Sequence, residues 1–397
     1  MVFEEFVPLN KLLQKNKSIT YGIVQPGDYN ENGIVMIRSQ DYSAGWGKIS
    51  NLFKVSEEID RPYIRSRVNK GDILITVVGA NIGKIAVVPD ELDCSNISRS
   101  VARISIDSTK ANSEFVRYFL ENRIERLLYV YKVGGAQPVL NLDDLQQFKI
   151  PLPPHSEQHA IAQVLSTADA AIHTTEKLIA QKELRKKWLM QQLLTGRKRL
   201  KGFSGEIKPK VVGKFIKEIS ERNKDLNVSR VLSVTNSRGF INQSDQFDRS
   251  VASEDATNYK IVRKGQFAYN PSRVNVGSLD LLRNFDEGIL SPMYVVFSTD
   301  EKHLLADFLY FHLKTQWFYG HIPMFVQGSV RDSLSFDGLC SMKFIIPTIE
   351  EQTAIAKVLQ MADKEISLLK AKAEKLREMK KGLMQQLLTG KVRLKIN

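Results

Sequence analysis

The chain has 397 residues, of which 57 are lysine or arginine and 44 are aspartate or glutamate, giving a formal net charge of +13. This length predicts two to three domains. The basic excess favours a polyanionic partner, because lysine and arginine gain affinity by displacing counterions from phosphates; the alternative is a basic protein without such a partner.

Two cysteines, Cys94 and Cys340, exclude a disulfide framework and a cysteine-rich metal site, and they fit a reducing cytoplasm. The first residues, MVFEEFVPLN, lack the apolar segment of a signal peptide. The longest apolar stretch, ILITVVGANIGKIAVV, is interrupted by polar residues and is not expected to span a membrane. We therefore expect a cytoplasmic protein.

Residues 1–153 are predicted to form a strand-rich domain. The runs GIVMIRS, DILITVV, KIAVVPD and SVARISID are rich in β-branched residues and are separated by Gly, Pro, Asn and Asp. A helix is predicted over residues 113–131. The domain ends in GGAQPVLNLDDLQQFKIPLPP, where glycine and proline disfavour regular structure.

Residues 157–195 are predicted to form one long helix that ends at Gly196. Its apolar positions alternate in steps of four and three, which is typical of a coiled-coil seam. The seam comprises Ile161, Leu165, Ala168, Ile172, Thr175 and Ile179.

Residues 202–347 repeat the strand-rich pattern in the runs RVLSVT, QFAYN, SLDLL and MYVVFS, with a helix predicted over residues 304–318. A second long helix is predicted from about residue 350 to residue 388. Its seam comprises Ile355, Leu359, Ala362, Ile366, Leu369, Ala373 and Leu376.

The two long helices are copies of each other at an offset of 194 residues. Residues 157–201 and 351–395 align without a gap, and 23 of these 45 positions are identical. The strand-rich segments share only scattered positions at the same offset. A whole module has therefore been duplicated, and its helix was kept while its other part diverged.

The fold class that we predict is α+β, as a tandem pseudo-two-fold duplication. Two strand-rich domains are separated by two long helices that form an antiparallel coiled coil. The alternative is that each helix packs only on its own domain. The predicted boundaries are 1–153, 154–201, 202–347 and 348–397.

Three short motifs come close to catalytic or metal-binding patterns. In VVGANIGKI the glycine spacing is one residue too short for a phosphate-binding loop, and Ile85 replaces the required Ser or Thr, so we interpret it as a turn between strands. The run Asn270-Pro271-Ser272-Arg273 lacks the second proline and the aromatic residue of an adenine-methyltransferase loop. His155 and His159 have no third ligand. We predict no catalytic residues and no metal site.

The chain resembles the specificity subunit of type I restriction–modification enzymes, because two variable strand-rich domains alternate with two near-identical helices. The resemblance covers essentially the whole chain. Its most specific parts are the helix openings PPHSEQHAIAQVL and PTIEEQTAIAKVL and the helix ends LMQQLLTG. The segments KGDILITVVGANIGKIAVV and KGQFAYNPSRVNVGSL are similar to the target-recognition domains of this family.

This resemblance implies a non-catalytic, sequence-specific DNA-binding subunit. Target-recognition domains at 1–153 and 202–347 would each read one half of a bipartite, asymmetric site in double-stranded DNA, and the helical spacer regions would set the unread spacer. The implied partners are two methyltransferase subunits and two ATP-dependent restriction subunits. S-adenosylmethionine, ATP and Mg²⁺ are expected on those subunits, and no cofactor is expected in this chain.

Candidate DNA-binding residues are those in polar loops, because phosphate contacts come from Lys and Arg and base contacts from Arg, Asn, Gln and Ser. Each of them could instead be a solvated or turn-forming residue. The candidates are Arg38, Ser39, Gln40, Lys84 and Gln137 in the first domain, and Ser272, Arg273, Asn275, Gln327, Ser329 and Arg331 in the second.

Two other functions compete with DNA recognition. A non-catalytic coiled-coil adaptor that joins proteins without touching nucleic acid would not need the charge of +13. An enzyme that acts alone on DNA would need catalytic and cofactor motifs, which we did not find in the sequence.

Overall fold

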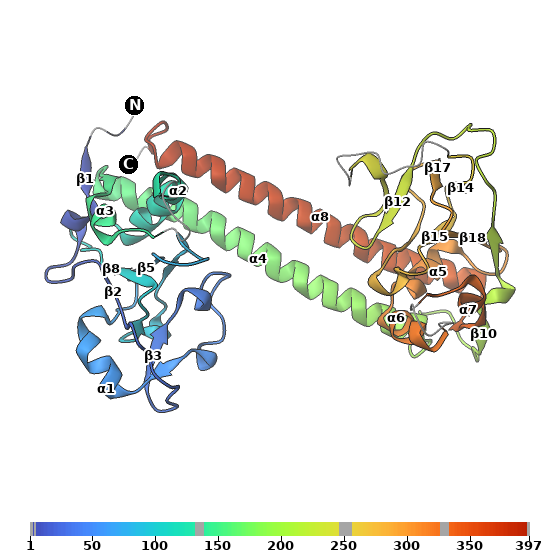
Figure 1. Ribbon diagram of the computed structural model, residues 1–397, viewed down its shortest axis with the longest axis horizontal. Coiled ribbons are helices and arrows are strands. Elements are labelled where there is room, and N and C mark those ends of the chain that lie inside the picture. Colours follow the sequence, from blue (N-terminus) through green and yellow to red (C-terminus); the bar gives the residue numbers. More distant parts are fainter. Residues whose placement is uncertain (1–2, 4, 132–138, 246–255, 326–332, 395–397) are drawn as a thin grey trace. The chain divides into compact units, whose positions relative to one another are not determined.

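The computed structural model describes residues 3, 5–131, 139–245, 256–325 and 333–394. The chain forms two compact units. Unit 1 comprises Met1–Glu176 and Ala371–Asn397, and unit 2 comprises Lys177–Lys370. Each unit contains one strand-rich domain together with a part of each long helix (Figure 1).

A four-stranded antiparallel sheet forms the centre of unit 1. Its order is β2 (Thr20–Tyr21), β8 (Val101–Ile104), β5 (Ile73–Thr76) and β6 (Ile85–Val87). All four residues of β5 are buried, because Ile73 and Ile75 lie in the core shared with the helices whereas Leu74 lies in a second core. A strand covered on both faces reads as a continuous apolar run, which explains the sequence DILITVV.

Smaller elements of unit 1 flank this sheet. A three-stranded sheet has the order β4 (Lys54–Val55), β3 (Ile34–Ile37) and β7 (Asn96–Ile97), and β1 (Phe6–Pro8) pairs with β9 (Lys149–Pro151). Of these pairs, only β3 with β7 is parallel. The helices of this domain are α1 (Glu57–Asp60), α2 (Ser113–Tyr131) and α3 (Leu142–Gln147). The helix predicted over residues 113–131 is thus confirmed.

Unit 2 has an equivalent four-stranded sheet with the order β11 (Ile216–Ile219), β18 (Val295–Thr299), β15 (Phe267–Tyr269) and β16 (Leu279–Leu281). Its two-stranded sheets are β10 (Pro209–Val211) with β19 (Lys343–Ile345), β12 (Leu232–Thr235) with β13 (Gly239–Asn242), and β14 (Lys260–Arg263) with β17 (Glu287–Leu290). Repetition of the central sheet in both units confirms the predicted α+β duplication.

The helices of the second domain are α5 (Ala306–Leu313), α6 (Gln316–His321) and α7 (Phe336–Ser341). The single helix predicted over residues 304–318 is therefore wrong. The first helix, α5, ends at Leu313. A new helix, α6, then begins, and the Thr315 hydroxyl caps it by accepting a hydrogen bond from the Phe318 backbone N–H at 3.2 Å.

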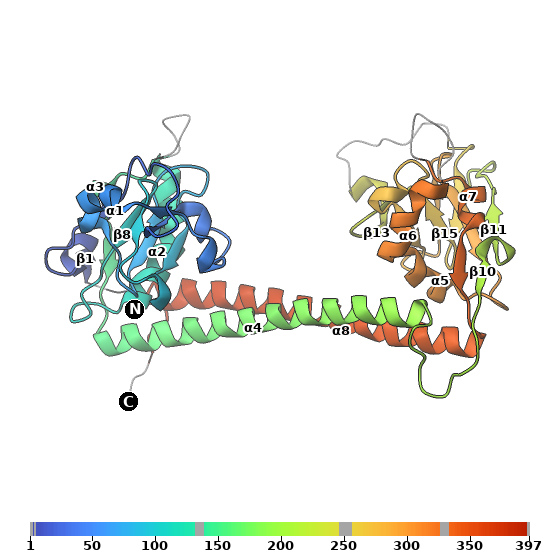
Figure 2. The ribbon, with the colours of Figure 1, turned by 90° about the horizontal axis from the view of Figure 1, so that it is seen from below.

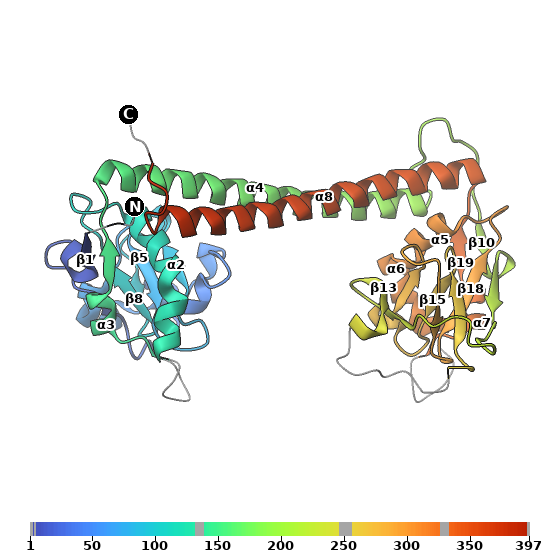
Figure 3. The same cartoon turned by 90° about the horizontal axis from the view of Figure 1, so that it is seen from above.

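The long helices are α4 (His155–Leu194) and α8 (Ile349–Leu387). In unit 1 the start of α4 lies beside the end of α8, and in unit 2 the end of α4 lies beside the start of α8 (Figure 1, Figure 2 and Figure 3). Ile161 and Leu165 share a core with Leu387 and Leu388. The antiparallel coiled coil is thus confirmed within each unit.

Both helix parts also pack on the strand-rich domain of their own unit. The core of unit 1 includes Phe115 of α2 as well as the helix residues, and the core of unit 2 includes Phe308 of α5. Gly196 ends α4 with a positive φ of 69°, which confirms the predicted stop. None of the helices in the described part of the chain has the length and apolar character needed to cross a bilayer.

Candidate nucleic-acid interface

A tight turn joins β5 to β6 and presents Lys84 to solvent. The Lys84 backbone N–H donates to the Asn81 carbonyl at 3.0 Å, and its carbonyl accepts from the Thr76 N–H at 2.9 Å. Gly83 has a φ of +84°, a conformation that favours glycine. The interpretation of VVGANIGKI as a turn between strands is confirmed. The fixed backbone leaves the Lys84 ammonium exposed, where it can reach a phosphate.

Arg38, Ser39 and Gln40 follow β3. Arg38 is held locally: its Nη2 donates to Asp41 Oδ1 at 3.1 Å, its backbone N–H donates to Asp41 Oδ2 at 2.7 Å, and its guanidinium lies 5.2 Å from the Phe53 ring centre. Gln40 is exposed and Ser39 is half-buried. Gln40 is therefore freer than Arg38 to approach a base edge.

The loop from β15 to β16 in unit 2 is the counterpart of the β5–β6 turn in unit 1. Asn270 organises it, because its side-chain oxygen accepts from the Ser272 backbone N–H at 3.1 Å and its carbonyl accepts from the Arg273 N–H at 3.0 Å. This Asx turn explains the run Asn-Pro-Ser-Arg without methyltransferase chemistry. Ser272, Arg273 and Asn275 are all exposed.

The two turns have the same backbone plan but different side chains. Gly277 in unit 2 has a φ of +95°, like Gly83 in unit 1. The next residue, however, is exposed Lys84 in unit 1 and buried Ser278 in unit 2, whose hydroxyl donates to the Val234 carbonyl at 2.8 Å. A shared turn thus presents different chemical groups in the two units.

A hollow of about 410 Å³ opens beside the unit 2 turn, between it and the hairpin β12–β13. Its polar lining includes Asn236, Gln243, Asn270 and Arg273. Amide and guanidinium groups of this kind bind base edges in DNA grooves. Sequence reasoning missed Asn236 and Gln243; the hairpin-turn signal TNSRG, which precedes Gln243 by three residues, could have pointed to them.

Four predicted site residues, Gln137, Gln327, Ser329 and Arg331, lie outside the described residues. His155 and His159 lie at the start of α4. His155 Nε2 is 3.0 Å from the Ser108 carbonyl oxygen, and His159 Nδ1 is 3.4 Å from Asn112 Nδ2. Both histidines thus contact the domain of unit 1, which fits their interpretation as residues of a helix end.

The dipeptide Glu-Gln that opens both long helices joins helix and domain. Gln158 accepts from the Asn112 N–H at 2.8 Å and donates to the Pro153 carbonyl at 2.8 Å. Gln352 makes the equivalent bonds with the Leu305 N–H at 2.9 Å and the Pro347 carbonyl at 3.0 Å. Both glutamines are buried, so these bonds satisfy polar groups that water cannot reach.

The glutamates of the same dipeptides bind arginines that follow the C-terminal end of the other long helix. Glu157 accepts from Arg393 at 2.5 and 2.7 Å in unit 1, and Glu351 accepts from Arg199 at 2.5 Å in unit 2. The bonds from Arg393 are the main cause that lowers the pKa of Glu157. Residues repeated at the offset of 194 therefore link the start of each long helix to the segment that follows the other.

The chain belongs to the family of the type I restriction modification DNA specificity domain, whose model matches residues 7–183 and 281–378, more than half of its length. It is similar to the EcoBI specificity subunit of a type I restriction enzyme from Escherichia coli, with 36% identity over 200 residues. That match covers 50% of this chain and 41% of the subunit, so it spans less than half of the relative's length.

Other relatives match over more of their length. Similarity to the MjaVIII specificity subunit of Methanocaldococcus jannaschii, at 25% identity, covers 83% of this chain and 80% of that subunit. The crystal structure of a type I restriction–modification S subunit from M. genitalium matches with a TM-score of 0.59 and 14% identity, over 100% of this chain and 97% of the other. A chain from a structure of type I R-M system assembly and conformational transition matches with a TM-score of 0.58 and 16% identity, over 98% of each. The structural matches show a shared fold.

Proposed function

We propose that this chain is the sequence-specific DNA-binding subunit of a type I restriction–modification complex and reads a bipartite, asymmetric site in double-stranded DNA. The observation that carries the proposal is the contrast within the duplication. Contacts that hold helix to helix and helix to domain are repeated, whereas the turns that face solvent carry different side chains. Two different half-sites require this contrast.

Lysine and arginine in these turns would position the domains on the phosphates, and amides would read bases. Lys84 and Arg273 are suited to the first role, and Gln40, Asn275 and the newly found Asn236 to the second. Arg38 would act indirectly, because its ion pair with Asp41 holds the loop that carries Gln40. Gln137, Gln327, Ser329 and Arg331 remain predicted contacts, as do Ser39 and Ser272.

The chain would contribute recognition and assembly, and other subunits would contribute the chemistry. Two methyltransferase subunits would bring S-adenosylmethionine, and two restriction subunits would bring ATP and Mg²⁺. We place the complex in the cytoplasm, where the DNA of a bacterial or archaeal cell lies.

Salt dependence of DNA binding tests this proposal against the coiled-coil adaptor. The purified chain, without its methyltransferase, is titrated with duplex DNA at several salt concentrations. A recognition subunit loses affinity as salt rises, with a slope of about −0.9 per neutralised phosphate in a plot of log K against log salt concentration. An adaptor shows no binding at any salt concentration.

A further inference from the structure

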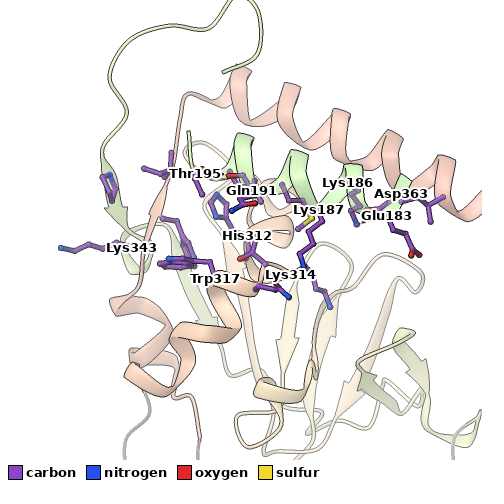
Figure 4. A pocket seen from close by; sticks show the side chains of 18 of the residues that line it. Glu183, Lys186, Lys187, Gln191, Thr195, His312, Lys314, Trp317, Lys343 and Asp363 are labelled. Carbon is purple, nitrogen blue, oxygen red and sulfur yellow. Dashed lines mark hydrogen bonds and ion pairs between the residues drawn. The ribbon is translucent and has the colours of Figure 1, made fainter. Parts of the chain in front are cut away.

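A groove of about 740 Å³ lies in unit 2 between the second half of α4, the corner between α5 and α6, and β19 (Figure 4). Its floor is largely apolar and comprises Met190, Leu194, Phe344, Ile345 and Ile366. Trp317 stands at its edge with 41% of its surface exposed. A groove of this size and lining can hold a large side chain of a ligand.

His312 lies in this groove, and one of its nitrogen atoms is unsatisfied. The residue is only 6% exposed, and its Nε2 has no hydrogen-bond partner among the residues that the structure describes. The ring hydrogen bonds to the backbone of Ile345 on its other side, and burial lowers the pKa of His312 to about 3. The neutral ring therefore leaves Nε2 as an unsatisfied, buried hydrogen-bond acceptor in the wall of the groove.

The other unit shows that packing alone does not require a histidine here. The α2 run EFVRYFL (Glu114–Leu120) aligns with the α5 run DFLYFHL (Asp307–Leu313), so Phe119 corresponds to His312. Phe119 is equally buried, at 4% exposure. A buried unpaired acceptor costs stability unless a donor reaches it, and phenylalanine avoids that cost.

The rim of the groove carries free positive charge. Lys186 and Lys370 are paired with Asp363 and Glu183. In contrast, Lys187 and Lys343 are exposed and have no ion-pair partner within the described ranges. Acidic groups beside the groove would therefore meet uncompensated cations.

An exposed apolar side chain of α4 lies next to the groove. Leu184, which lies three residues before Lys187 and hence on the neighbouring stripe of the helix, is 68% exposed. Its counterpart at the offset of 194 is Glu378 on α8. Leu184 therefore adds exposed apolar surface beside the groove.

We propose that this groove docks a segment of the methyltransferase subunit that inserts one tyrosine or tryptophan and flanks it with acidic residues. The phenol hydroxyl or indole N–H donates to His312 Nε2, the ring packs against Trp317 and Phe344, and the acidic residues face Lys187 and Lys343. This inference rests on the proposed function for the identity of the partner. It adds that the two docking positions differ, because unit 1 has Phe119 in place of the acceptor.

Calorimetric titration of the full-length chain with purified methyltransferase subunit tests the groove. His312→Phe, the residue of the other unit, keeps the packing and removes the acceptor. Lys187→Glu reverses a surface charge and leaves the core intact, and Lys381→Glu is its matched control on α8. We expect two binding events in the wild type. His312→Phe and Lys187→Glu each weaken one event at least tenfold, and Lys381→Glu leaves that event unchanged.

The outcomes separate the inference from the function that it rests on. If the wild-type chain binds DNA but no methyltransferase, the proposed partner is wrong. If the wild type binds methyltransferase and both groove variants bind it equally well, or weaken both events alike, the groove is not the docking site and the proposed function stands. A photo-cross-linker in place of Leu184 should label a methyltransferase peptide that contains Tyr or Trp beside acidic residues; a labelled peptide without an aromatic residue contradicts the proposal.

Discussion

Glu183 of α4 forms an ion pair with Lys370 of α8 in unit 2, with 2.6 Å between Oε1 and Nζ. At the corresponding place in unit 1, Glu176 of α4 pairs with Arg377 of α8. At the offset of 194 residues, Glu183 corresponds to Arg377 and Lys370 corresponds to Glu176, so each position carries the opposite charge in the other copy. If α4 met a second copy of itself in the same register, Glu176 would face Glu183. The exchanged pair therefore favours pairing of α4 with α8.

Reversing one charge of this pair should destabilise unit 2 slightly, and reversing both should restore stability. Glu183→Lys and Lys370→Glu each place like charges together, and the double variant recreates the arrangement of unit 1. Because both side chains are about half exposed, we expect a coupling free energy of about 0.2–1 kcal/mol. Urea unfolding of the four proteins measures it; additive effects in the double variant would show that the pair does not interact.

Truncation of Gln352 should cost much more than truncation of an exposed glutamine. Gln352→Ala leaves the Leu305 N–H and the Pro347 carbonyl without their partner in a fully buried place. We expect a loss of about 1–3 kcal/mol in the free energy of unfolding. Gln385→Ala, at an exposed position of α8, is the control and should change stability little. Equal effects of the two variants would argue against the bridging role.

The Arg393–Glu157 pair should make unit 1 sensitive to acid. The pKa of Glu157 is lowered in the folded state, chiefly by its hydrogen bonds from Arg393, so the pair stabilises the fold above the ordinary glutamate pKa of about 4.3. This contribution is lost as the pH falls through the lower folded pKa. We expect Arg393→Gln to be less stable than wild type at pH 7, and the difference to shrink as the pH falls from 7 toward 3, in unfolding followed by circular dichroism. A constant difference across this range would contradict the pair's role.

His312 should add a separate pH dependence between about pH 6.5 and pH 3. Burial lowers its folded pKa to about 3, so the unfolded chain binds a proton in this window that the folded chain does not. Stability therefore falls with falling pH, by at most about 1.4 kcal/mol per pH unit for one such group. His312→Phe should lose less stability than wild type between pH 6.5 and pH 5. Parallel pH profiles for the two proteins would show that His312 is not buried as a neutral ring.

Local patterns in the sequence predicted the two long helices and the helix over residues 113–131. They could not predict how strands that are distant in the sequence pair with each other. The seam of α4 and α8 is readable because a coiled coil repeats its apolar positions along one segment. The strand order β2-β8-β5-β6 depends on contacts between residues far apart, such as Ile73 with Ile104, and no local pattern encodes it. The break between α5 and α6 depends on the cap at Thr315, within a run that otherwise has helical spacing.

Contacts within the chain explain a part of the repetition at the ends of the two long helices. Arg199 binds Glu351 and the Gly205 carbonyl, so a part of the repeated sequence preserves the fold of each unit. Among the candidate DNA contacts, the pairing of Arg38 with Asp41 was not predicted, because it depends on the turn that follows β3. The hollow with Asn236 was not predicted either, because it joins a hairpin to a distant turn.

Methylation mapping tests the central claim most directly. Cells that carry the chain and its methyltransferase are sequenced for modified adenines, with wild type, Gln40→Ala in unit 1 and Asn275→Ala in unit 2 compared. We predict a bipartite, asymmetric motif in the wild type, with Gln40→Ala weakening or relaxing only one half and Asn275→Ala only the other, each by about tenfold or more. An undivided motif, or variants that alter the same half, would contradict the account.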